Sequence, residues 1–134
     1  IRDSLFPSPS YSLPESSRLF QAIHLLIKQL LERGISLILD ATNLSERYRE
    51  RLYSIADRLD VKLILVRVTA PPQVVYTRLK ARLDNHEGNS DADWAVYQRM
   101  KSRVQRIRRN HYVVDTSEDI TPALDKIVRE AKRG

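Results

Sequence analysis

The sequence predicts an α/β fold in which a parallel sheet is flanked by helices. A short apolar run suited to a buried strand stands at 35–39 and is followed by small polar residues, and further strands are expected at 63–68 and 111–115. Stretches with helical spacing precede, separate and follow these runs, in the order helix–strand–helix–strand–helix–helix–strand–helix. Such alternation is typical of parallel sheets with right-handed crossover connections.

The first helix is expected to begin at a capping box and to end at a glycine. Residues 1–13 contain prolines and serines and are expected to form a loop. Ser12 and Glu15 have the spacing of a capping box, and Gly34 is a good helix-ending residue. His24 lies within this apolar helix and is expected to be a partly buried packing residue. The apolar residues with helical spacing are Leu19, Ile23, Leu26, Ile27 and Leu30.

The strand predicted at 35–39 ends at an acidic residue, Asp40. Ligands of open parallel sheets bind just beyond this end of the strands. A carboxylate there suits the phosphates and Mg²⁺ of a bound nucleotide, because Mg²⁺ prefers carboxylate and water ligands. The alternative is a carboxylate that caps its own turn.

The later elements follow from capping residues and apolar spacing. Two further strands are expected at Leu63–Val68 and His111–Asp115. The later helices are expected to begin at Ser45, Pro72, Ser90 and Thr121. The first of them should keep its arginines outside and bury a stripe of Tyr48, Leu52, Ile55, Ala56 and Leu59.

Composition and charge limit the class of protein. A chain of 134 residues with 42% hydrophobic and 30% charged residues is expected to form one globular domain. There is no cysteine and no apolar run of membrane-spanning length, so a soluble cytoplasmic protein is expected, with no disulfide and no thiolate metal site. The net charge of +6 favours anionic partners. Six basic residues crowd one segment: Arg99, Lys101, Arg103, Arg106, Arg108 and Arg109.

Two arginines stand at helical spacing after the second predicted strand. Arg78 and Arg82 are four positions apart and therefore project from one face of a helix. Arginine is suited to bidentate contacts with phosphate. On spacing alone, two solvated arginines are the favoured interpretation.

Several phrases resemble the P-loop kinase family that includes polynucleotide kinase, zeta toxin-like kinases and bacterial predicted kinases. The resemblance covers essentially the whole chain, and its most specific phrase is LDATNL at 39–44. The phrase RLKAR at 78–82 resembles the start of the family's lid, and 91–100 resembles the helix that follows it. Residues 113–117 resemble the last strand and the loop beside the adenine. The resemblance implies a three-layer P-loop NTPase-like sheet with a lid region at about 78–100.

The resemblance also implies roles for individual residues. Arg82 matches the lid arginine that neutralises charge on the transferring phosphoryl group, and Arg78 would support it. The ATP contacts would come from Asp40, Asn43, Asp115 and Thr116, with Asp40 also near Mg²⁺ through indirect contacts. The acceptor would be held by Arg2, Asn43 and Arg47. Ile1 and Arg2 resemble the end of the family's Asp-x-x-Arg motif, whose general-base Asp would precede Ile1.

The chain departs from the family pattern in one large respect. It contains no G-x-x-x-x-G-K loop followed by Ser or Thr, and its three glycines are Gly34, Gly88 and Gly134. That loop supplies backbone donors, a lysine and a hydroxyl to the phosphates and Mg²⁺. The loop is expected to precede Ile1, which makes this chain the carboxyl-terminal part of a kinase domain. Alone, the chain is expected to be inactive and to bind no ATP or Mg²⁺.

Two functional hypotheses follow. In the first, the protein is an ATP-dependent kinase whose acceptor is a hydroxyl of a nucleic-acid end or of a small molecule. In the second, the chain is a remnant without a P-loop that binds RNA or a protein through its basic segment. No membrane partner is expected in either case.

The missing loop has a consequence for the sheet. In family members the P-loop strand lies between the strands that correspond to 35–39 and 63–68. Without it, the backbone groups of both strands would be left unpaired. We therefore expect these strands to pair directly, or the gap to be filled by a swapped dimer or a complementing fragment.

Overall fold

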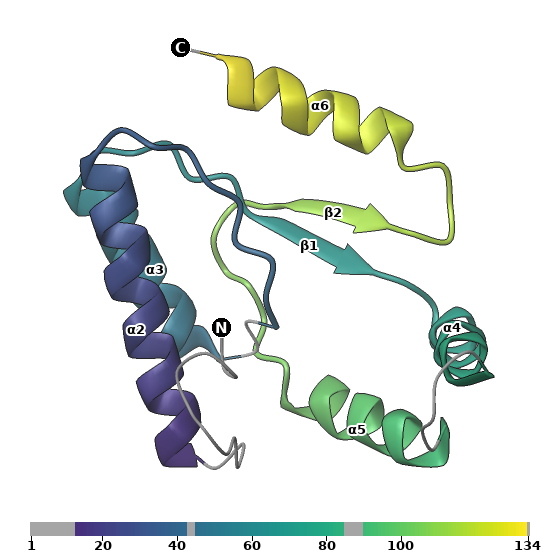
Figure 1. Cartoon of the computed structure of the whole chain (residues 1–134). Coiled ribbons are helices and arrows are strands. Elements are labelled where there is room, and N and C mark those ends of the chain that lie inside the picture. The colour runs from purple at the N-terminus through teal and green to yellow at the C-terminus, as the bar shows by residue number, and fades with distance from the viewer. Residues whose placement is uncertain (1–12, 43–44, 85–89, 134) are drawn as a thin grey trace. The chain divides into compact units, whose positions relative to one another are not determined.

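The computed structural model describes residues 13–42, 45–84 and 90–133 of the chain. The chain divides into two compact units, Ile1–Leu63 and Ile64–Gly134, and each unit is described by itself. Figure 1 shows the helices of the first unit and the strands and helices of the second.

The first unit contains two helices that pack together, α2 (Leu13–Glu32) and α3 (Glu46–Arg58). Helix α2 ends as predicted, at Gly34, whose φ of 75° lies in the left-handed region that favours glycine. The N–H of Gly34 donates to the Leu31 carbonyl at 2.9 Å, and the N–H of Ile35 donates to the Leu30 carbonyl at 3.0 Å. These two bonds form a Schellman motif.

The faces that α2 and α3 bury are partly those predicted. The rings of Phe20 and Tyr48 stack with centroids 4.3 Å apart. His24 is buried, which confirms its expected packing role. Helix α3 buries residues spaced i, i+4 and i+7, namely Arg49, Tyr53 and Ala56. The prediction that the arginines of α3 lie outside is therefore wrong for Arg49.

The strand predicted at 35–39 is not formed. Residues 35–40 have neither strand nor helix geometry, and the side chain of Ile38 is 96% exposed. A strand forms when a neighbour pairs with its N–H and C=O groups. Within the described residues the sheet has two strands, neither of them at 35–39, so direct pairing of 35–39 with 63–68 is not found. Filling of the gap by another chain stays a prediction.

The second unit contains the parallel sheet. Strand β1 (Val66–Thr69) pairs in parallel with β2 (Tyr112–Asp115), with Val66 opposite Tyr112 and Thr69 opposite Asp115. The parallel pairing of the two later strands confirms the α/β character of the fold. Strand β1 begins and ends later than the predicted Leu63–Val68.

Three helices accompany these strands: α4 (Pro72–Asp84), α5 (Ser90–Arg103) and α6 (Thr121–Lys132). Helix α6 contacts β2, and α4 contacts α5. The second contact includes Tyr76 and Trp94, whose rings meet edge to face with centroids 5.2 Å apart. All three helices begin where the sequence predicts, at Pro72, Ser90 and Thr121.

The buried apolar core of the described residues is small. Its side chains are Ile27, Tyr53, Ala56 and Val114. In the sheet, Val66 and Val68 of β1 are 40% and 66% exposed. None of the helices in the described ranges is long and apolar enough to cross a membrane.

Candidate functional site

Polar side chains meet at the carboxyl ends of the two parallel strands. Thr69 ends β1 and Asp115 ends β2, and the two residues are partners in the register of the sheet. Parallel strands present their carboxyl ends at one edge, which is where open sheets bind ligands. This edge is therefore the candidate site of the second unit.

Thr116 joins the two strand ends. Its backbone N–H donates to the Thr69 carbonyl at 2.9 Å, and its hydroxyl Oγ1 lies 3.3 Å from the same oxygen. The first bond continues the parallel ladder by one residue beyond β2. The loop after β2 is thereby held against the end of β1.

Arg78 reaches this edge from α4. Its Nη1 donates to Thr116 Oγ1 at 2.5 Å and its Nη2 donates to the Thr116 carbonyl at 2.8 Å. The planar guanidinium can make two such bonds at once because its donors form a rigid fork. The structure thus brings together two of the residues predicted from sequence, Arg78 and Thr116.

Asp115, a third predicted residue, has a carboxylate that is held ionised. Its Oδ1 accepts hydrogen bonds from Ser117 Oγ at 2.6 Å and from the Ser117 N–H at 2.9 Å. These two bonds lower the pKa of Asp115, and the charge of Arg78 lowers it further. A fixed negative charge therefore lies beside the Arg78 guanidinium at neutral pH.

Arg82 lies on the last turn of α4, one helical turn beyond Arg78. Its side chain is exposed. Residues four apart on a helix lie on the same face, so Arg82 and Arg78 share the face predicted from their spacing.

The remaining predicted residues belong to the first unit or lie outside the described residues. Asp40 is exposed in the irregular stretch after α2, and Arg47 is exposed on the first turn of α3. Arg2 and Asn43 lie outside the described residues. In the described ranges no group of three or more His, Asp or Glu side chains comes together as a metal site.

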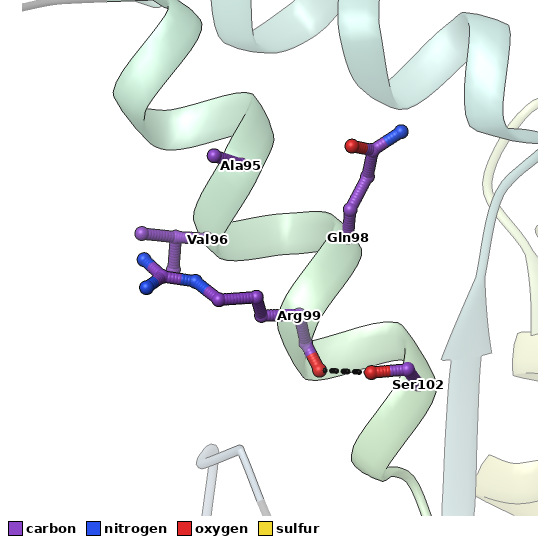
Figure 2. A pocket seen from close by; sticks show the side chains of 5 residues that line it. All are labelled: Ala95, Val96, Gln98, Arg99 and Ser102. Atoms are coloured by element: carbon purple, nitrogen blue, oxygen red, sulfur yellow. Dashed lines mark hydrogen bonds between the residues drawn. The ribbon is translucent and has the colours of Figure 1, made fainter.

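Two features were not predicted from the sequence. Thr69 shares the signal that identified Asp40, a polar residue directly after an apolar strand, and could have been found in the same way. The other feature is an open hollow on α5, shown in Figure 2, where Ser102 Oγ donates to the Arg99 carbonyl at 2.8 Å. The hollow is lined by Ala95, Val96, Gln98, Arg99 and Ser102. No motif marks these residues.

Residues 1–107 match the model of an AAA domain family. Comparisons with curated proteins and with solved structures give no match. The matched family is of the P-loop NTPase type, and the match covers both units and extends past α5. The chain belongs to this AAA domain family.

Proposed function

We propose that the chain is the carboxyl-terminal part of an ATP-dependent P-loop kinase domain, which transfers the γ-phosphoryl group of ATP to a hydroxyl acceptor. The observation that supports this most is the bond pair from Arg78 to Thr116 at the ends of β1 and β2, in a chain of the AAA family. It gathers an arginine, hydroxyls and a carboxylate at the edge where nucleotides bind to parallel sheets.

The proposal divides the roles between the two units. In the second unit, Asp115 and Thr116 face the nucleotide, and Arg82 neutralises charge that develops on the transferring phosphoryl group. From the first unit, Asp40 and Asn43 are proposed to contact the phosphates, as the family resemblance implies. Arg2 and Arg47 hold the acceptor, which is a nucleic-acid end or a small molecule.

Mg²⁺ fits this proposal only as an ion shared with the nucleotide. Mg²⁺ commonly takes one or two carboxylates together with phosphates and water. Asp40 offers one exposed carboxylate of that kind. When bound, the ion would neutralise phosphate charge.

The proposal requires a phosphate-binding loop from outside these 134 residues, since the sequence has none. Such a loop carries most of the contacts to the β- and γ-phosphates. The chain alone should therefore bind Mg-ATP more weakly than micromolar affinity and transfer no phosphoryl group.

Calorimetry and a radiolabel assay test this proposal together. Mg-ATP titrated into the 134-residue chain should give no micromolar binding. A protein whose reading frame is extended upstream of Ile1 through a P-loop should transfer labelled γ-phosphate to a hydroxyl acceptor. Micromolar binding by the short chain, or an upstream frame without such a loop, would refute the proposal.

A second candidate function rests on the basic segment that begins on α5. Arg99, Lys101 and Arg103 are exposed, and no acidic residue interrupts the sequence from 99 to 109. Such a surface suits the backbone of single-stranded RNA. In this hypothesis the chain is a nucleic-acid-binding module rather than a kinase part.

Fluorescence anisotropy with a labelled RNA oligonucleotide tests this candidate. Replacing Arg99 and Arg103 by Gln should weaken binding and reduce the slope of log K against log salt by about 0.7 for each phosphate that the variant no longer neutralises. A matched control replaces Lys126 and Arg129 of α6, which are also exposed. Equal weakening in both variants would mean that net charge alone, and no defined surface, binds the RNA.

A further inference from the structure

Both terminal nitrogens of the Arg78 guanidinium donate hydrogen bonds to a single residue. Nη1 and Nη2 donate to the hydroxyl and the carbonyl of Thr116, which lies 38 positions later in the sequence. Hydrogen bonds from a charged donor are stronger than neutral ones, and a forked pair fixes orientation as well as distance. The part of α4 that carries Arg78 is therefore tied to the loop after β2.

Thr116 also forms hydrogen bonds with the end of β1. Its hydroxyl accepts a hydrogen bond from Arg78 and lies at hydrogen-bond distance from the Thr69 carbonyl. A hydroxyl can make both bonds at once, because it has one donor and two lone pairs. Its N–H donates to the same carbonyl. Three segments thus meet at Thr116: the end of β1, the end of β2 and helix α4.

This geometry separates the two arginines of α4. The two terminal nitrogens of Arg78 that would bind a pair of phosphate oxygens already donate hydrogen bonds to Thr116. Arg82 lies one turn farther along the helix and is exposed. If the same two nitrogens bound a phosphate, both hydrogen bonds from Arg78 to Thr116 would have to break.

We infer that Arg78 is a positioning residue that ties α4 to the loop after β2, so that it sets the affinity for the nucleotide and leaves turnover to Arg82. This inference rests on the proposed kinase function. In this role Arg78 holds the loop after β2, with Asp115 and Thr116, in the conformation that the proposed function assigns to nucleotide binding.

The kinetic test uses the kinase that contains this chain and its P-loop. Arg78→Lys keeps the charge but removes the fork, and Thr116→Val removes the hydroxyl at nearly constant shape. Each should raise the KM for ATP roughly 10-fold, with kcat unchanged. The double variant should be no worse than the more severe single variant, because both remove the same tie. A fall in kcat at unchanged KM, or additive effects, would overturn the inference.

A second measurement decides whether the tie exists, whatever the function. The carboxyl of Asp115 is titrated by NMR in the 134-residue chain. Arg78→Gln should raise its pKa, because the charge of Arg78 contributes to the lowering. Arg82→Gln removes an equal charge one turn away and should leave that pKa unchanged. No rise in Arg78→Gln, or equal rises in both, would overturn the tie. If the rise occurs but no variant of the protein uses ATP, the proposed function and the nucleotide role fail while the tie stands.

Discussion

The stretches 35–40 and 66–69 begin from similar sequences and reach different structures. Both contain aliphatic residues that precede a polar residue, Asp40 in one and Thr69 in the other. The second run becomes strand β1, whereas the first forms neither strand nor helix and pairs with no strand of the described residues. The difference lies in the neighbour: β1 has β2 beside it in register, and 35–40 has no strand partner there. An apolar run is thus only a potential strand until another strand pairs with it.

The polar residues at the two ends differ in the same way. Thr69 is held by Thr116, and Thr116 by Arg78. Asp40 is exposed on a stretch that no strand of the described residues supports. A site needs side chains fixed by their surroundings, and the side chains at the ends of β1 and β2 are fixed in this way.

The largest effect is expected on the rate of catalysis, when arginines of the two units are replaced in turn. Under the proposed kinase function, Arg82→Ala in a protein that contains this chain and a P-loop should lower kcat about 10³-fold, as for an arginine that stabilises a transferring phosphoryl group. Arg47→Ala, in the first unit, should raise the KM for the acceptor and leave kcat unchanged. Steady-state kinetics with both substrates measures the two constants. A change in KM alone for Arg82→Ala would assign this arginine to ground-state binding.

A smaller effect is expected on stability. Val114 of β2 is 5% exposed, so Val114→Ala should lower the free energy of unfolding by about 2 kcal/mol. Ile38→Ala removes a larger side chain that is 96% exposed and should change it by no more than about 0.5 kcal/mol. Urea denaturation of the 134-residue chain gives both values. If Ile38→Ala lowered the free energy of unfolding by about 2 kcal/mol or more, residues 35–40 would be buried in solution. The contrast between this stretch and β1 would then be wrong.

Much of the helical structure was predictable because its signals are local. The predicted starts at Pro72, Ser90 and Thr121 and the end at Gly34 agree with the structure. Capping residues and a glycine with positive φ act within one helical turn, so no distant part of the chain is needed to identify them.

The errors arise where structure depends on distant residues. The stretch 35–39 forms no strand because strand pairing is non-local, and the burial of Arg49 depends on tertiary packing that the apolar spacing within α3 does not report. At the site, Arg78 and Thr116 were predicted separately through the family resemblance. Their contact across 38 positions could not be read from the sequence, because it requires the turn from β1 into α4 and the register of β2.

The last and smallest effect concerns the pairing of α2 with α3 in the first unit. His24 is 8% exposed, and within the described residues its Nε2 has no hydrogen-bond partner. Burial lowers the pKa of His24 below 6.5, and the charge of Arg51 lowers it further. The neutral imidazole is therefore the form that packs between the helices.

The sign of the pH dependence follows from this lowered pKa. As the pH falls below about 6.5, His24 takes up a proton in the unfolded chain before it does so in the folded one, so stability should fall. The fall should begin near the unfolded pKa and end once the pH is below the folded pKa. His24→Gln removes the titration and keeps a polar side chain, and His111 remains as a common background in both proteins. Urea midpoints measured from about pH 7.5 to about pH 5 should decline more steeply for the wild type than for the variant. Equal declines of the urea midpoint with falling pH would show that His24 is exposed to water in solution. Helices α2 and α3 would then not pack around this side chain.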